Sequence, residues 1–401
     1  MTGTPTILIV GAGPAGLAAA AALLERGHRP ILADREPEPG GIPRFCPHPT
    51  FGLPDAFRPM TGPAWARRLA ARAAGADLRL ATTVTALAPD GEVTLADATG
   101  ERTFRPDRIL LATGARETPR AARLVSGDRP LNVLTTGALQ RLLAQGRKLP
   151  FSRPAIVGTE LVAFSAALQL REHGAPPVGM IEEAPRVTAR RPADAAIRLL
   201  GVPVLTAHRL AAIRARADDP ARLASLLLDT PAGPRDLPCD AVVFTGQFLP
   251  ETALLPDAPA VGPPVDQCWR LDRPGLYAAG NLLRAVETAG WCAAEGRAAA
   301  LALHADLAGL PAARRIPLTA VDPVRLVTPG AIAVPGPAPG PLQMLVRMAR
   351  PATGRLTLAA DGAVFWRSRR LAALPERRLR LTRRLPDLSG TATLTAGFEE
   401  G

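Results

Sequence analysis

The chain has 401 residues, 47% of them apolar and 21% charged, which is enough apolar material for two or three folded domains. Its formal net charge is +12, but every basic residue except Lys148 is an arginine. We interpret this arginine excess as compositional bias and expect no nucleic-acid partner. No apolar run reaches the roughly 18 to 20 residues of a membrane helix, and the N-terminus lacks the basic start of a signal peptide, which predicts a cytoplasmic protein.

The four cysteines are far apart in the sequence and form no Cys-x-x-Cys or Cys/His ligand pattern. This spacing predicts neither a disulfide framework nor a zinc or iron–sulfur site, so we expect no metal. The cysteines are Cys46, Cys239, Cys268 and Cys292.

The first predicted element is a strand at residues 6–10, followed by a glycine-rich turn and an alanine-rich helix. A G-x-G-x-x-G turn between strand and helix is typical of a dinucleotide-binding unit. In such a unit, Gly11 permits the tight turn and Gly13 lets backbone N–H groups approach a pyrophosphate. Gly16 lets the helix pack closely on the strand.

The second predicted strand, residues 30–33, ends at Asp34, eighteen residues past Gly16. A carboxylate at this distance is placed to accept hydrogen bonds from an adenosine ribose. Arg35 lies beside it and joins the predicted nucleotide site.

Two later strands end in glycine motifs. Residues 107–114, DRILLATG, end with Thr113 and Gly114, and residues 274–281, PGLYAAGN, end with Gly280 and Asn281. Together with the first turn, these segments resemble the FAD-binding segments of the two-dinucleotide-domain flavoproteins, the glutathione-reductase-like pyridine nucleotide-disulfide oxidoreductase superfamily.

The resemblance implies FAD as the cofactor. In this superfamily an acid at the position of Asn281 binds the flavin ribityl chain, and an asparagine can still hydrogen-bond a ribityl hydroxyl without carrying charge. By the same resemblance Val84 offers its backbone to the adenine, or else is an ordinary core valine. A helix is predicted from Thr288 to 303. Its N-terminal amides would point at the flavin and stabilise the negative charge that develops at the flavin N1–O2 edge when the flavin is reduced.

Between these segments lies a second strand, turn and helix unit with the layout of a nicotinamide-dinucleotide domain. Its turn begins at Gly158, but Glu160 and Ala163 stand where the pattern has glycines. A carboxylate at this place repels a pyrophosphate and fills the space that backbone contact requires. We therefore favour an altered site over a working NAD(P) site. If a dinucleotide binds, Glu182 or Glu183 favours NAD over NADP.

The predicted fold is α/β, with a Rossmann-like FAD-binding domain, an inserted NAD(P)-binding-like domain and a small β-rich C-terminal domain. We interpret the arginine-rich tail as either a docking surface or a solvated face. The expected boundaries are 1–150 for the first part of the FAD domain, 151–262 for the insertion, 263–310 for the FAD return segment and 320–401 for the C-terminal domain.

The stretch after Gly40 and Gly41 excludes one reaction. In disulfide reductases of the superfamily a Cys-x4-Cys pair follows the double glycine near the flavin, and the corresponding residues here are Pro43 and His48. No dithiol can form, so the chain lacks the chemistry of thioredoxin or glutathione reduction.

Several segments are similar to those of a non-disulfide branch of bacterial FAD-dependent oxidoreductases. They are Gly40-Gly41-Ile42, Cys46-x-His48 and residues 158–162 and 280–291. Members of this branch are associated with dehydrogenases of opines, proline-type amino acids or glycerol 3-phosphate. The resemblance implies two-electron transfer between a small-molecule substrate, or a partner dehydrogenase subunit, and an acceptor. The cysteine-containing C-terminal iron–sulfur module of opine-oxidase subunits is absent from this sequence.

Two residues near the predicted flavin are candidates for catalysis. His48 titrates near neutrality and is either a proton donor or acceptor, or a packed side chain. Cys46 is a nucleophile or charge-transfer donor only if its thiolate is stabilised, and is otherwise a packed residue. The alternatives are an NAD(P)H-dependent flavin reductase and a non-catalytic flavin-binding subunit that docks a partner.

Overall fold

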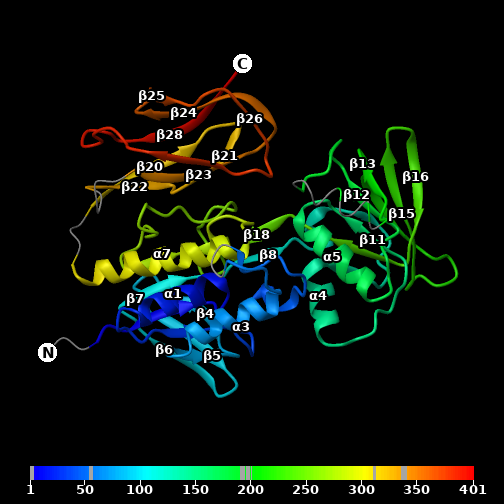
Figure 1. Ribbon diagram of the computed structural model, residues 1–401, viewed down its shortest axis with the longest axis horizontal. Helices are drawn as coiled ribbons and strands as arrows, with labels where there is room; N and C mark the ends of the chain where they lie inside the picture. The colour runs from blue at the N-terminus through cyan, green and yellow to red at the C-terminus, as the bar shows by residue number, and fades with distance from the viewer. Residues whose placement is uncertain are drawn as a thin grey trace.

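The computed structural model describes residues 4–53, 57–189, 201–309, 313–335 and 341–401, together with 195 and 199. Its strands form three bodies: one with blue, cyan and yellow parts, one mainly green, and one orange to red (Figure 1). In these described residues no helix combines the length and apolarity needed to cross a membrane.

The first body contains a five-stranded parallel sheet in the order β19-β7-β1-β2-β3. Its central strand is apolar and buried throughout because the sheet is covered on both faces. This sheet is the Rossmann-like unit that the first glycine turn predicts. The strands are β1 (Ile7–Val10), β2 (Ile31–Ala33), β3 (Asp77–Arg79), β7 (Arg108–Leu111) and β19 (Leu276–Ala278).

Helices α1 (Pro14–Leu24) and α7 (Ala289–Leu307) pack against each other beside this sheet. Their close approach depends on Gly296, because a Cβ atom there would lie 2.0 Å from the carbonyl oxygen of Ala15. Helix α3 (Gly62–Arg72) packs beside α1. A three-stranded sheet shares a core with the other face; its strands are β4 (Thr83–Leu87), β5 (Val93–Asp97) and β6 (Gly100–Phe104).

The second body contains another parallel sheet, in the order β10-β17-β11-β12-β13, with helices α4 (Thr136–Ala144) and α5 (Leu161–Glu172). Strand β10 pairs with β17, so residues well before the expected boundary at 151 belong to this sheet. Its strands are β10 (Val133–Thr135), β11 (Pro154–Val157), β12 (Gly179–Glu182), β13 (Val204–Thr206) and β17 (Ala241–Phe244).

A four-stranded sheet completes the second body, and a short strand pair connects it to the first. The sheet contains β9 (Ser126–Gly127), β14 (Arg209–Ala215), β15 (Leu223–Thr230) and β16 (Gly233–Pro238). In the connection, β8 (Ala115–Glu117) runs antiparallel to β18 (Phe248–Pro250). The two chain segments that connect the first and second bodies are therefore hydrogen-bonded to each other.

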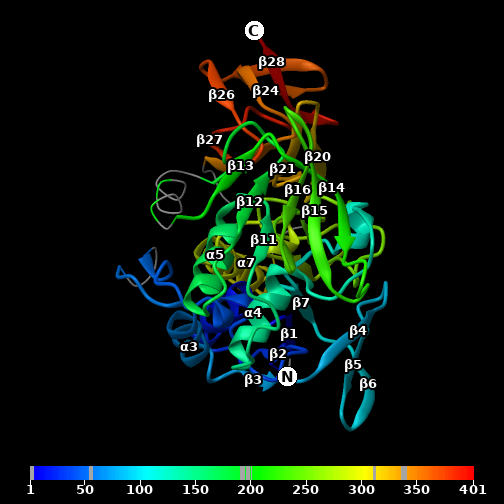
Figure 2. The same ribbon diagram turned by 90° about the vertical axis from the view of Figure 1, so that its right-hand side faces the viewer.

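The C-terminal body is β-rich, as expected, and lies beside α7 on the side opposite α1 (Figure 1). It begins with β20 at Arg314, before the boundary at 320. Figure 2 shows it at the opposite end of the molecule from the first sheet. Its strands are β20 (Arg314–Ala320), β21 (Val324–Thr328), β22 (Ala331–Val334), β23 (Leu342–Met348), β24 (Ala352–Ala360), β25 (Ala363–Arg367), β26 (Leu371–Ala373), β27 (Leu379–Arg383) and β28 (Leu394–Glu400).

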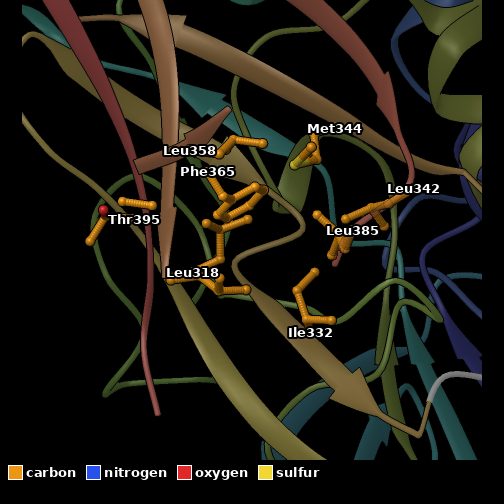
Figure 3. Close-up of a pocket in the computed structure, with 10 residues that line it drawn as sticks. Leu318, Ile332, Leu342, Met344, Leu358, Phe365, Leu385 and Thr395 are labelled. Carbon is orange, nitrogen blue, oxygen red and sulfur yellow. The ribbon is translucent and has the colours of Figure 1, made fainter. Parts of the chain in front are cut away.

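The interior of this C-terminal body is a packed apolar core. Side chains from several strands, among them Leu318, Ile332 and Met344, point toward one another (Figure 3). The space left between them is about 10 Å³, barely the size of one water. This body therefore offers no interior cavity for a substrate at that place.

Candidate functional site

The glycine turn at the N-terminus of α1 is tightly packed at two of its glycines. Gly11 has a φ of 107°, and a Cβ atom added to it would lie 2.5 Å from the carbonyl oxygen of Ala112. A Cβ atom on Gly16 would lie 1.8 Å from the carbonyl oxygen of Gly11. Packing within the protein therefore requires both glycines, whether or not a ligand binds.

Gly13 is different, because a Cβ atom added to it would meet no protein atom within 4 Å. Its φ of −77° and ψ of −173° are open to any residue, so the backbone does not require glycine. The second glycine pair lies against this turn: a Cβ atom on Gly41 would be 2.9 Å from the Gly13 Cα atom. The turn thus borders free space at a helix N-terminus, which fits an approaching pyrophosphate.

Asp34 lies beside this turn and is hydrogen-bonded to its backbone. Its carboxylate accepts hydrogen bonds from the backbone N–H groups of Ala12, at 2.5 Å, and Glu36, at 2.8 Å. Arg35 beside it is exposed. The N–H of Thr82 donates to the Asp34 carbonyl at 2.9 Å, which brings the strand that carries Val84 to the same edge.

Val84 itself is half-buried in β4. Its side chain packs against the apolar core below the five-stranded sheet, and its strand partner is Leu95. The position is compatible with a backbone contact to adenine and with a structural valine, so the predicted adenine contact stays a prediction.

The two later glycine motifs lie near the first glycine turn. A Cβ atom on Gly11 would lie 3.4 Å from the Thr113 nitrogen. Thr113 also donates its hydroxyl to the Glu251 carbonyl at 2.8 Å, and the Gly114 carbonyl accepts from the Glu251 N–H at 2.9 Å. A Cβ atom on Gly280 would lie 3.0 Å from the Cβ of Ala15, in the first turn of α1. The fold therefore gathers segments that are more than 250 residues apart in the sequence.

Asn281 holds the loop that leads into α7. Its side-chain oxygen accepts from the Glu287 N–H at 2.7 Å, and its side-chain NH₂ donates to the Glu287 carbonyl at 3.4 Å. Thr288 is the N-cap residue of α7 and is exposed, but its side chain makes no capping hydrogen bond. The first turn of α7 thus keeps backbone donors for another acceptor.

Cys46 follows the short 3₁₀ helix at Ile42–Phe45 and is buried. Its sulfur accepts from the Gln140 side-chain NH₂ at 3.6 Å, and its S–H donates to the Ile42 carbonyl at 3.6 Å. Burial raises the pKa of Cys46 to about 11, so the thiol is protonated at neutral pH. The thiolate stabilisation on which its catalytic role depends is not provided by this environment.

His48 lies two residues further on, stacked on the ring of Phe51 with 5.5 Å between centroids. Its Nδ1 atom is 2.8 Å from the hydroxyl oxygen of Thr50. Burial lowers the pKa of His48, and the negative charge of Glu172 offsets this in part. His48 is therefore a neutral imidazole at pH 7, which can accept a proton.

The second glycine turn is occupied by a side chain of its own. Cβ atoms added to Gly158 and Gly246 would lie 2.7 Å and 2.8 Å from the carboxylate of Glu160, which precedes α5. Burial raises the pKa of Glu160, and a hydrogen bond with Thr245 offsets this only in part. The carboxylate fills the space between the ends of β11 and β17.

One of the two acids predicted to favour NAD over NADP already has hydrogen-bond partners within the protein. Glu182 accepts hydrogen bonds from the Thr159 hydroxyl and, at 2.9 Å, from the Ala184 N–H. Thr159 is fully buried and also accepts from the Thr188 N–H at 3.1 Å. The chain after β12 thus folds back over the second turn.

A buried ion cluster beside Gly280 was missed by the sequence analysis. Arg284 is only 2% exposed and pairs with Glu295, whose other oxygen accepts from the Gly280 N–H at 3.1 Å. Glu287 belongs to the same cluster and pairs with arginines of the C-terminal body. No local pattern marks such a cluster, because those arginines follow 60 or more residues later.

Comparison with known proteins agrees with this architecture. The family model described as pyridine nucleotide-disulphide oxidoreductase matches residues 5–296. The crystal structure of T. acidophilum thioredoxin reductase is similar to 76% of the chain and 99% of its own, with a TM-score of 0.65 at 20% identity. At that identity the likeness concerns the fold alone.

Two curated relatives are each named as a subunit of opine oxidase. The protein from Rhizobium meliloti (strain 1021) is 34% identical over 184 residues, which is 44% of this chain and 38% of that protein. The protein from Agrobacterium tumefaciens (strain Ach5) is 29% identical over 343 residues, or 75% of this chain and 65% of that protein. The chain thus spans less than two thirds of the length of either relative.

The family match covers both glycine turns, the strands that carry them and the N-terminal part of α7. It includes the open turn at Gly13 and the altered turn at Glu160. The chain therefore belongs to the pyridine nucleotide-disulphide oxidoreductase family, whose members are FAD-binding oxidoreductases.

Proposed function

We propose that the protein is an FAD-dependent oxidoreductase, a dehydrogenase or oxidase subunit that passes two electrons between a small organic substrate, or a partner dehydrogenase, and an acceptor. The observation that carries this proposal is the free space at Gly13, beside the N-terminus of α1. When bound, FAD supplies the redox chemistry, and the protein supplies orientation and electrostatics. A cytoplasmic location stays a prediction.

In this proposal the turn at Gly13 faces the pyrophosphate with backbone N–H groups, and Asp34 faces the ribose. Asn281 faces the ribityl chain, and the first turn of α7 stabilises negative charge at the flavin. His48, as a neutral imidazole, accepts the substrate proton. The residues proposed to hold FAD are Gly11, Gly13, Gly16, Asp34, Arg35, Gly41, Val84, Thr113, Gly114, Gly280, Asn281 and Thr288.

The position of Glu160 supports an organic electron donor over a nicotinamide. Its carboxylate occupies the space through which a dinucleotide pyrophosphate would approach Gly158, so the side-chain volume opposes binding even though burial raises the pKa of Glu160 and disfavours its charge. The alternative, an NAD(P)H-dependent flavin reductase, is favoured by the second parallel sheet, which retains the dinucleotide-domain layout.

The names of the two relatives, each a subunit of opine oxidase, support an assembly with another protein chain. A non-catalytic subunit whose flavin is structural is a further alternative within that assembly. Robust turnover by the isolated chain would exclude it.

Anaerobic titration of the purified flavoprotein, followed by visible absorbance, tests the direction of electron flow. We expect an opine, a proline-type amino acid or glycerol 3-phosphate to bleach the flavin band, either without or with a partner protein. NADH is expected to leave the band unchanged on the same timescale. Rapid bleaching by NADH would instead establish the reductase alternative, and a protein that binds no FAD would refute the proposal.

The substitution Gly13→Ala tests the FAD site itself. The added methyl group meets no protein atom, so the fold should be unaffected, but it occupies the space of the pyrophosphate. We expect FAD affinity to fall by about 100-fold or more, within the range of lost charged hydrogen bonds. Gly390→Ala is the matched control, since a Cβ atom there also meets nothing within 4 Å. If Gly13→Ala binds FAD as tightly as the wild type does, FAD does not bind at this turn.

A further inference from the structure

The carboxylate of Glu287 is the meeting point of three arginines. It is 7% exposed, and its Oε1 atom is 2.6 Å from Nη2 of Arg347 in β23. Its Oε2 atom pairs with Arg378, which lies just before β27. Arg284 approaches Oε1 to 3.6 Å. Two of these three partners belong to the C-terminal body, so the carboxylate joins that body to the loop before α7.

The backbone of the same residue is bound by Asn281. Both the N–H and the carbonyl of Glu287 are hydrogen-bonded to the Asn281 side chain, at 2.7 Å and 3.4 Å. A displacement of the Glu287 carboxylate therefore displaces the peptide groups that orient Asn281. The other end of this loop is fixed too, because Glu295 accepts from the Gly280 N–H and pairs with Arg284.

The charges of this cluster make the conformation of the loop sensitive to each partner. Three guanidinium groups converge on Glu287. Among the described residues, the cluster has two carboxylates, those of Glu287 and Glu295, so its positive charges outnumber its negative ones. The side chain of Arg284 is 3% exposed, so water screens this charge poorly. Removing Arg347 takes away the close charged partner of Oε1 and leaves that oxygen with only the longer contact to Arg284, so we expect the carboxylate and its loop to shift.

We propose that Glu287 is a positioning residue of the FAD site, through which Arg347 and Arg378 of the C-terminal body set the orientation of Asn281 toward the ribityl chain. This inference rests on the proposed function. It assigns the C-terminal body a part in cofactor binding although that body lies outside the dinucleotide-binding sheets.

A double-mutant cycle on the full-length flavoprotein tests the inference. We expect Arg347→Gln and Asn281→Ala each to raise the FAD dissociation constant by about tenfold, and the double variant to be no worse than Asn281→Ala alone. The visible spectrum of bound flavin should shift alike in both single variants. Arg347→Lys, which keeps the charge, should recover most of the affinity. Arg367→Gln breaks a half-exposed pair with Glu399 in the same body and is the matched control.

Additive effects of the two substitutions, or wild-type FAD affinity in Arg347→Gln, would overturn the inference. If Arg347→Gln does not fold, Arg378→Gln enters the same cycle with the same expected outcome. Thermal unfolding of each variant separates general loss of stability from loss of cofactor. A wild-type protein that binds no FAD would refute the proposed function instead, before any variant is compared.

Discussion

At the scale of single residues, Glu160 shows how one side chain alters what a fold can bind. The surrounding strands keep the parallel order of a dinucleotide domain, and Gly158 keeps its positive φ of 125°. The carboxylate nevertheless occupies the gap between Gly158 and Gly246. Gly13, in the equivalent turn of the first sheet, leaves that gap open. The difference between the two turns lies in side-chain volume and charge.

The substitution Glu160→Gly is expected to reopen the second turn. It removes the side-chain volume that blocks a pyrophosphate, together with any charge that the buried carboxylate carries, so NADH affinity should rise by about tenfold or more. Fluorescence titration with NADH measures this change. Glu160→Gln removes the charge but keeps the volume, and it separates the two causes. Wild-type protein that binds NADH as tightly as Glu160→Gly would contradict our interpretation of the turn.

At the scale of elements, α1 and α7 form one unit although the second body separates them in sequence. Gly296 permits their contact along one side, and at their C-terminal ends His28 and His304 meet with 2.9 Å between Nε2 and Nδ1. Only one of two facing nitrogens can carry the proton of a hydrogen bond, so protonation of both rings breaks this contact. The helix pair is thus sensitive to pH at one end.

The pH dependence of stability should reveal this contact. Burial, with the charge of His304, lowers the pKa of His28 below its usual value. The folded state therefore favours the neutral ring of His28. The contribution of His28 to the free energy of unfolding is complete above about pH 6.5 and is lost as the pH falls below that value. We expect the fall in Tm between pH 7.5 and pH 5.5 to be about 1–2 °C smaller in His28→Gln.

Thermal unfolding of both proteins across that pH range gives the comparison. His208→Gln is the control, since His208 contacts the carbonyl of Thr206 in the second body, away from the helix pair. An equal fall in Tm for wild type and His28→Gln would show that the histidine pair does not contribute.

The elements also show which parts of the fold could be predicted. The strand at 6–10 and its turn are local patterns, in which apolar runs and glycines are visible within a few residues, and both were confirmed. Strand β10 has only three residues, and its partner β17 follows more than 100 residues later. Its membership of the second sheet depends on that distant pairing, which local periodicity does not encode.

The candidate site divides in the same way. The glycines and Asp34 follow from a motif with fixed spacing, and the structure gathers them at one helix end. The environment of Cys46 does not follow from spacing, because Gln140, the donor to its sulfur, comes from another body. The arginines on Glu287 are equally distant in sequence. Side chains contributed by other bodies are what the sequence alone could not place.

At the scale of the whole molecule, the second body is held by contacts with both of the others. Toward the first body, Arg141 pairs with Glu36 at 2.7 Å, and the Gln169 side chain donates to the Phe45 carbonyl at 3.0 Å. Toward the C-terminal body, Arg186 forms two hydrogen bonds with Glu376, at 2.8 Å and 3.1 Å. These contacts oppose rotation of the second body.

Loss of the Arg186 contact should loosen the arrangement of the bodies without unfolding any of them. The pair is partly exposed, so Arg186→Gln should cost about 1 kcal/mol or less in stability. Small-angle X-ray scattering is expected to show a larger radius of gyration, and proteolysis between the bodies should be faster. Arg214→Gln, which breaks an exposed pair with Asp236 inside the second body, is the control. Identical scattering from both variants would contradict a bracing role.

The order of strands in the first sheet has a consequence for synthesis of the protein. The edge strand β19 and helix α7 follow the whole second body in the chain, yet they complete the sheet that starts with β1. A ribosome therefore releases all strands of the second body before the first sheet can close. Domains generally fold as units during synthesis, so we infer that the second body folds first while β1 and α1 wait for their partners. Binding of FAD then belongs to a late stage of maturation.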